Sequence, residues 1–344
     1  MKRLIAFKQR RIIKLIAGQL LMRFISISPR VWNRNIILVY HRVLSEPPQG
    51  FCETSLYLNY ATLDMHLKQL SKYYELIPLQ TLIKSKKQRR GLCSITFDDG
   101  WIDTYDIAFP ILRKNRVPAT VFVPTGLIGK GYGYWFEDLN YLANESVQEK
   151  ATLFIQIFSH LFPSWRCTEL SNESLSALIS CMKHLPSNDL IKIVNSAYEK
   201  LNIQRSPKKV IINWEQIREM SQHDISFGPH GSRHYILPTV STYLKKEEIF
   251  KPLFEMEEMG IKGLPIFSYP NGDWDDESAC LLYQAGYEAA VSNRLGYVNE
   301  HTDMSIFALN RVDMCEANSN TPSLFWFRLF QAILQRSERL QALV

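Results

Sequence analysis

Short runs of β-branched and aromatic residues alternate with amphipathic helical patterns along most of this 344-residue chain. The candidate strands are residues 36–40, 93–97, 119–123, 224–228, 265–269, 289–292 and 305–309. Helical patterns lie between several of them and begin at Tyr60, Tyr105, Trp214, Tyr243 and Glu277. This alternation predicts βα units around a parallel sheet, and the length accommodates an α/β barrel.

One region interrupts the alternation. Residues 137–209 contain no convincing strand pattern, only amphipathic helical stretches such as EKATLFIQIFSHLF and NDLIKIVNSAYEKLN. Loops of a barrel accept long additions because they run over its surface. We therefore interpret 137–209 as a helical insertion in a barrel of residues 35–320, which either covers a substrate cleft or mediates association.

The charge is concentrated at one end of the chain. The net charge is +6, and residues 1–35 hold nine Lys or Arg and no acidic residue. The remaining chain is mildly acidic, so nucleic-acid binding is not indicated. The six cysteines show no CxxC spacing, which suggests neither a zinc knuckle nor a disulfide framework and slightly favours a reducing compartment.

Residues 1–34 form a basic amphipathic segment. Its uncharged runs, LIAGQLLM and FISISP, are shorter than the roughly 18 apolar residues of a membrane span, so we expect neither a spanning helix nor a cleavable signal peptide. Ile5, Ile12, Ile16 and Leu20 share one side of a helix, and Arg3, Arg10, Arg11 and Lys14 lie on the other. Two interpretations stay open, an interfacial helix on anionic lipid and a helix packed on the protein itself.

The C-terminal residues 321–344 repeat this pattern as an amphipathic helix rich in Phe and Trp. Two such segments favour a cytoplasmic protein that contacts the inner face of a membrane peripherally.

Reactive side chains follow the candidate strands. They are His41 after 36–40, Asp98 and Asp99 after 93–97, His230 after 224–228, Asn271 after 265–269, and Arg311 and Asp313 after 305–309. In a βα barrel these strand ends form one face, where active sites are built. We therefore expect these residues to converge on one pocket.

Asp99, His230 and His234 make a candidate metal triad of one carboxylate and two imidazoles. This donor set suits Zn²⁺, and also Fe²⁺, Co²⁺ or Ni²⁺. A bound divalent ion lowers the pKa of its water to about 7, and Asp98 is a candidate base for that proton. An HxxxH pair alone is more often structural, and an Asp-Asp-Gly alone is more often a turn. Their combination at strand ends indicates a hydrolytic site.

Three segments carry a resemblance to a known family. TFDDG (96–100), FGPHGSRH (227–234) and FSYPNGDWD (267–275) resemble the first three motifs of the polysaccharide deacetylases, the NodB-homology group or carbohydrate esterase family 4. The similarity extends from about Ile36 to Asp313, apart from the insertion. It implies a distorted (β/α)7-type barrel that removes N-acetyl groups from N-acetylhexosamine residues of a polysaccharide or lipid-linked glycan.

The resemblance also implies roles for individual residues. Asp98 would be the general base, and Asp99, His230 and His234 would bind a divalent ion, with Zn²⁺ the leading candidate. Asn271 and Tyr269, in the third motif, would contact the substrate or the developing oxyanion.

The chain departs from the family pattern at several positions. Gly231 stands where Ser or Thr is usual, Ser268 and Asn271 replace an arginine and a tyrosine, and no late leucine-x-histidine motif follows residue 301. In a subgroup the acid is the histidine of a YH motif after the first strand, which His41 matches.

Several alternatives stay open. Arg311 is a candidate to orient Asp98, or else pairs with Asp313 or Asp275, and His41 is a catalytic acid or a structural histidine. Trp135, Phe136 and Trp274 are candidates to stack on sugar rings. For the whole protein, the alternatives are a catalytically impaired glycan-binding or assembly protein, and an O-acetyl esterase or deformylase of a lipid-linked sugar.

Overall fold

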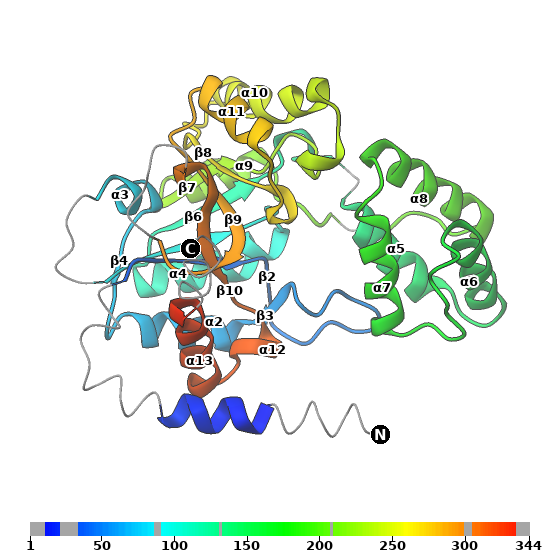
Figure 1. Ribbon diagram of the computed structural model, residues 1–344, viewed down its shortest axis with the longest axis horizontal. Helices are drawn as coiled ribbons and strands as arrows, with labels where there is room; N and C mark the ends of the chain where they lie inside the picture. Colours follow the sequence, from blue (N-terminus) through cyan, green and yellow to red (C-terminus); the bar gives the residue numbers. More distant parts are fainter. Residues whose placement is uncertain are drawn as a thin grey trace, which may run out of the picture.

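A parallel sheet with the strand order β7-β6-β5-β1-β10-β9-β8 forms the centre of the molecule in this computed structural model (Figure 1). The structure describes residues 11–20, 34–85, 91–130, 133–206, 209–298 and 305–334. The strands are β1 (Ile36–Tyr40), β5 (Leu92–Phe97), β6 (Ala119–Val123), β7 (Ile225–Pro229), β8 (Ile266–Ser268), β9 (Ala289–Leu295) and β10 (Leu309–Asp313). A short strand, β4 (Glu75–Leu76), adds to β5, and β2 (Arg42–Leu44) pairs separately with β3 (Tyr57–Asn59).

The two ends of this sheet approach each other, so that it forms a nearly closed barrel. The Leu264 N–H, just before β8, donates to the Phe227 carbonyl in β7 at 2.7 Å. Gly228 permits this approach, because a Cβ there would lie 2.8 Å from both the Ile266 carbonyl oxygen and the Phe122 ring. The predicted α/β fold, a distorted (β/α)7-type barrel, is confirmed.

Helices surround the barrel and connect its strands (Figure 1). They are α2 (Tyr60–Leu70), α3 (Leu79–Lys84), α4 (Phe109–Asn115) after a π-helical turn at Thr104–Ala108, α9 (Trp214–Ser221), α10 (Thr242–Glu258), α11 (Asp276–Gln284), α12 (Glu316–Ser319) and α13 (Pro322–Leu334). Short 3-10 turns lie at Thr125–Leu127, Leu237–Thr239, Pro270–Gly272 and Ser305–Ala308. Side chains of Asn59, Asn213 and Asp275 cap α2, α9 and α11, which fixes where these helices begin.

The prediction of a strand at 305–309 is wrong. Residues Ser305–Ala308 form a 3-10 turn, and the strand is Leu309–Asp313, which pairs with β1 through Leu38 and Val312. The apolar run in SIFAL resembled a strand, yet Phe307 packs outside the sheet against Tyr283. The true strand contains Arg311, and a charged residue within a buried strand hides the usual apolar pattern.

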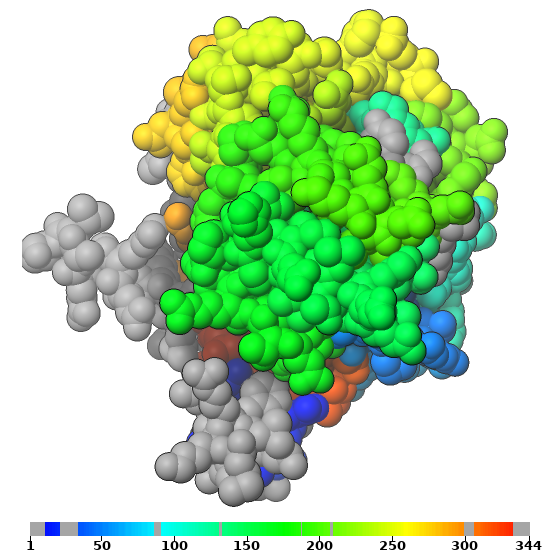
Figure 2. All heavy atoms as spheres, turned by 90° about the vertical axis from the view of Figure 1, so that its right-hand side faces the viewer, coloured from blue at the N-terminus to red at the C-terminus, as the bar shows by residue number. Residues whose placement is uncertain are grey.

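The predicted helical insertion consists of α5 (Trp135–Glu145), α6 (Glu149–Leu161), α7 (Asn172–Met182) and α8 (Ser187–Leu201). These helices stand beside the barrel in Figure 1 and occupy the front of the molecule in Figure 2. They share an apolar cluster of their own that includes Leu139, Phe154, Phe158, Leu178 and Val194. The insertion is therefore a small helical lobe rather than an extended loop.

The apolar side of α13 packs on the barrel. Leu324, Phe325, Trp326 and Leu329 are buried, and Phe325 stacks on His66 of α2. These large side chains are thus used in the core, so the described part of residues 321–344 gives no support to the expected membrane contact of that range. Among the described residues, no helix combines the length and hydropathy needed to cross a membrane.

Candidate active site

A cavity lies at the carboxyl ends of the barrel strands. It is lined by His41 after β1, Asp98 and Asp99 after β5, His230 and His234 after β7, Asn271 after β8, Asn293 in β9 and Asp313 in β10. The structure thus brings together residues that are far apart in the sequence. The insertion forms part of the wall through Trp135, Phe136, Ile179 and Lys183.

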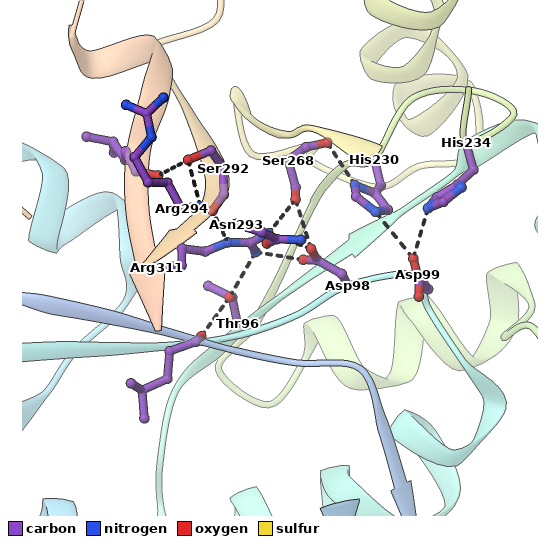
Figure 3. A network of polar contacts seen from close by, with 12 residues as sticks. Thr96, Asp98, Asp99, His230, His234, Ser268, Ser292, Asn293, Arg294 and Arg311 are labelled. Carbon is purple, nitrogen blue, oxygen red and sulfur yellow. Dashed lines mark hydrogen bonds and ion pairs between the residues drawn. The ribbon is translucent and has the colours of Figure 1, made fainter. Parts of the chain in front are cut away.

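Asp99, His230 and His234 converge at one point of this cavity (Figure 3). Asp99 Oδ1 lies 3.3 Å from His230 Nε2 and 3.2 Å from His234 Nε2. Ligand atoms around a tetrahedral Zn²⁺, at 2.0–2.1 Å from the ion, are separated by roughly 3.3 Å. The donor set and both of these distances therefore suit a divalent ion.

A hydrogen bond of His230 Nδ1 orients the imidazole ring. His230 Nδ1 lies 2.8 Å from the Ser268 carbonyl, and because a carbonyl only accepts, Nδ1 must donate. In the neutral imidazole the proton is therefore on Nδ1, and Nε2, the nitrogen that faces Asp99, is left to bind an ion. Ser268 thus acts on the metal triad through its main chain.

Asp99 is held in a left-handed backbone conformation with φ 73°. The Trp101 indole N–H donates to Asp99 Oδ2 at 2.9 Å, and the Tyr134 hydroxyl donates to the Asp99 carbonyl. Burial raises the pKa of the Asp99 carboxyl, but contacts with His230 and His234 outweigh it, so the pKa lies well below its ordinary value. Asp99 is therefore ionised and oriented as a ligand requires.

Glu248 of α10 shapes the loop that carries the two histidines. Its buried carboxylate accepts from the main-chain N–H of Arg233 at 3.0 Å and of Tyr235 at 3.3 Å. Burial raises the pKa of this carboxyl to about 7, although these N–H groups oppose the shift. Gly231 has φ +74°, and a Cβ there would collide with Glu248 Oε2. Glu248 therefore occupies the space beside Gly231, the position that departs from the family pattern.

Asp98 is held by Arg311 rather than by the metal triad. Its two carboxylate oxygens accept from Arg311 Nη1 at 2.8 Å and Nη2 at 2.6 Å, and both side chains are buried. The Ser268 hydroxyl donates to Asp98 Oδ2 at 3.1 Å. Burial raises the pKa of Asp98, but the guanidinium and His230 outweigh it, so the pKa lies below its ordinary value. Asp98 is thus held as an ionised carboxylate.

Further contacts hold Arg311 in place within the barrel (Figure 3). Its Nε donates to the Ser292 carbonyl at 3.0 Å, and Nη2 donates to Asn293 Oδ1 at 2.6 Å. The alternative partners considered from the sequence are engaged elsewhere, because Asp313 pairs with Arg328 and Asp275 with Lys245. Arg311 therefore positions Asp98.

In the third motif, residues 267–275, some side chains face the cavity and others are buried away from it. Asn271, with φ 59°, lines the cavity. The structure does not place Tyr269 there, contrary to the sequence prediction, because its buried hydroxyl donates to the Phe307 carbonyl at 2.9 Å. Trp274 stacks on Tyr269 and is likewise absent from the described cavity wall. Alternation along the strand explains this, since Ser268 faces Asp98 and its neighbour Tyr269 faces the other way.

Three residues that orient the triad were not predicted from the sequence: Glu248, Trp101 and Tyr134. Trp101 lies two residues after Asp99, so its position near the site was available from the sequence. Glu248 and Tyr134 gave no such local signal, because only the packing of α10 and of the segment before α5 brings them to the site.

This fold and site define a hydrolase of the carbohydrate deacetylase class. A family model described as polysaccharide deacetylase matches residues 85–180 and 191–290. The Bacillus subtilis protein YxkH, which carries the same family name, is 30% identical over 281 residues, or 80% of this chain and 70% of YxkH. The chain belongs to the polysaccharide deacetylase family.

Other similar proteins agree with this assignment. The poly-beta-1,6-N-acetyl-D-glucosamine N-deacetylase of Staphylococcus epidermidis is 25% identical over 228 residues, covering 61% of this chain and 77% of the relative. The solved Streptococcus pyogenes deacetylase PplD matches with a TM-score of 0.56 and 16% identity over 88% of this chain and 99% of PplD. IcaB from Ammonifex degensii matches with a TM-score of 0.54 and 17% identity over 86% of this chain and 97% of IcaB. At these identities the two structures show the shared fold.

Proposed function

We propose that this deacetylase is a metal-dependent amidase that removes N-acetyl groups from N-acetylhexosamine residues of a polysaccharide or lipid-linked glycan. The observation that carries the proposal is the position of Asp98, an ionised buried carboxylate that lines the same cavity as Asp99, His230 and His234. A base beside a set of ligands for a divalent ion is the arrangement that amide hydrolysis requires.

A divalent ion held by Asp99, His230 and His234 would polarise the acetamido carbonyl and lower the pKa of a water molecule. Asp98 accepts the proton of the attacking water. His41, on the cavity wall, donates a proton to the departing nitrogen as the carbon–nitrogen bond breaks, which releases acetate and a free amine. The main-chain N–H of Asn271 is our candidate donor to the carbonyl oxygen as negative charge develops there.

The wall supplied by the insertion suits a sugar. Trp135 and Phe136 offer aromatic surfaces at the cavity, and Lys183 offers a cation. Aromatic faces pack against the apolar faces of sugar rings, while hydroxyl groups need polar partners. We therefore assign glycan contact to α5 and α7.

The test combines elemental analysis of the purified protein with acetate release from N-acetylglucosamine oligomers and from lipid-linked acceptors. We expect a bound divalent ion, with Zn²⁺ the leading candidate. Asp98→Asn keeps the ion and loses activity, because the amide cannot accept the proton, and His230→Ala loses both. A wild-type protein that binds no divalent ion, and that added metal does not activate, would refute the proposal.

The same substrates separate the alternatives. An O-acetyl esterase or a deformylase would act on O-acetylated or N-formylated sugars and leave N-acetylglucosamine oligomers intact. An impaired binding protein would retain glycan and release nothing. The pairing of Asp98 with Arg311 favours a working enzyme, because it keeps a buried carboxylate ionised in the same cavity as the triad.

The proposal includes a cytoplasmic location at the inner face of a membrane, as expected from residues 1–34. Cell fractionation without detergent tests this location. Recovery of the full-length protein wholly in the soluble fraction would remove it from the proposal.

A further inference from the structure

The helical segment at residues 11–20 turns its most apolar side toward solvent. The exposed fractions are 54% for Ile12, 64% for Ile13, 53% for Ile16 and 51% for Leu20. With 3.6 residues per turn, these four side chains fall within an arc of about 100° around the helix axis. A helix on a soluble protein normally buries such a stripe against the core. Here the stripe points away from it.

The opposite side of this helix attaches it to the protein. Gly18 is buried against the beginning of α13, where a Cβ would collide with the Ser323 carbonyl. Arg11 donates to Asn320 Oδ1 at 3.3 Å. In Figure 1 the helix lies at the edge of the molecule, beside α13. These contacts fix the rotation of the helix, so the outward direction of its apolar side is a property of the fold.

The charge of this part of the sequence has one sign. Residues 1–35 contain nine Lys or Arg and no acidic residue, and Lys14 is exposed on the helix itself. A symmetric contact with a second copy would place the same patch against itself and bring like charges together. An anionic lipid surface accepts both the apolar side chains and the cations.

Another exposed apolar pair lacks this charge pattern. Phe250 and Phe254 of α10 are exposed by 44% and 61%. Glutamates and lysines accompany them on that helix, with Lys251 paired to Glu247. Mixed charge gives no attraction to an anionic surface, so α10 serves as an internal comparison.

We propose that residues 11–20 form a lipid-binding face that holds the protein on an anionic bilayer. Ile12, Ile13, Ile16 and Leu20 enter the boundary between headgroups and acyl chains, and the helix, about 15 Å long, lies in the plane of the surface. This inference rests on the membrane location proposed above, for which it names the contacting side chains, and it does not depend on the proposed chemistry.

Sedimentation of the full-length protein with vesicles tests the proposal. The probes are vesicles of phosphatidylcholine alone and of phosphatidylcholine with about one-third phosphatidylglycerol. We expect partition into the anionic vesicles, weakened by about 0.5 M salt. The double variant Ile12→Glu/Ile16→Glu lowers this partition about tenfold or more, because it places carboxylates in the apolar stripe. The matched double variant Phe250→Glu/Phe254→Glu partitions like the wild type.

Two further readouts make every outcome decisive. Thermal unfolding and acetate release from soluble oligomers should be unchanged in Ile12→Glu/Ile16→Glu, because both positions are exposed and neither lines the cavity. A wild type that stays in the supernatant, or an Ile12→Glu/Ile16→Glu variant that sediments like the wild type, overturns the proposal. So does a wild-type dimer that this variant dissociates in the absence of vesicle binding, which would make a second copy the partner.

Discussion

Arg311 holds both carboxylate oxygens of Asp98, with nitrogen–oxygen distances of 2.8 and 2.6 Å. Asp98 follows β5 and Arg311 belongs to β10, so the pair reaches across β1, which lies between those strands. Removing one member of a buried ion pair leaves an uncompensated charge and costs about 3–5 kcal/mol. This contact therefore affects both the stability of the barrel and the protonation of Asp98, the proposed base.

Arg311→Met is expected to raise the pKa of Asp98, because burial then disfavours the carboxylate without the guanidinium to oppose it. The acidic limb of kcat/KM for acetate release, measured against pH, should move to higher pH. In Arg311→Lys the acidic limb should move less than in Arg311→Met, because the lysine ammonium keeps the positive charge but cannot bind both carboxylate oxygens as the guanidinium does. An acidic limb that stays in place in Arg311→Met would contradict the pairing of a catalytic Asp98 with Arg311.

The same pair predicts how stability depends on pH. The pKa of Asp98 in the folded protein lies below its ordinary value of 3.8. The ion pair therefore stabilises the folded protein fully at pH values above the ordinary pKa of Asp98. This stabilisation is lost as the pH falls through the pKa of Asp98 in the folded protein. Unfolding midpoints measured in denaturant at decreasing pH should show this loss in the wild type. Arg311→Met should lack it, and equal slopes for the two proteins would count against the ion pair.

His41→Gln tests the assignment of the acid. We expect kcat to fall by about 10²–10⁴-fold while the bound metal is unchanged, because His41 lines the cavity but is not one of the three ligands. The matched control is His160→Gln, which changes an exposed histidine of α6. Full activity of His41→Gln would show that another group protonates the leaving nitrogen.

Glu248→Ala should weaken metal binding by about 10–100-fold, because it releases the main-chain N–H groups that hold the His230–His234 loop. Titration of the metal-free protein with Zn²⁺ measures this change. The neighbouring Glu247→Ala removes only a surface pair with Lys251 and should bind metal like the wild type. Equal Zn²⁺ affinities of the two variants would show that Glu248 does not support the metal-binding histidines.

Gly231→Ser introduces the residue type that is usual in the family, yet it should damage this protein. The left-handed backbone at Gly231 and the contact of a new Cβ with Glu248 should together cost about 1–3 kcal/mol. Denaturant unfolding gives the change in free energy. In Gly231→Ser/Glu248→Ala the collision is absent, so the double variant should be more stable than the sum of the single effects predicts. Strict additivity would argue against the clash.

The sequence predicted those site residues that directly follow an apolar strand pattern. Asp98 and Asp99 follow a run of apolar residues, and His230 follows another, so the pattern of strands followed by reactive groups indicated both the barrel and its active face. The bounds of the strand that carries Arg311 were predicted wrongly. Arg311 lies within β10, where its ion pair with Asp98 makes a charged residue compatible with the interior.

Residues that act through tertiary contacts were not predictable in this way. Glu248 lies inside α10, and its function depends on how that helix packs against the loop after β7. Tyr269 shows the opposite error, because it lies in a motif but faces away from the cavity. Attention to strand alternation around Ser268 would have corrected that assignment.

The strand order also bears on synthesis of the protein. The three proposed metal ligands, Asp99, His230 and His234, leave the ribosome before β10, which must insert between β1 and β9 to complete the barrel. A nascent chain that ends before residue 311 therefore carries every ligand of the triad but lacks the partner of Asp98. Completion of the last barrel strand is thus also the step in biosynthesis that gives Asp98, the proposed base, its buried cationic partner.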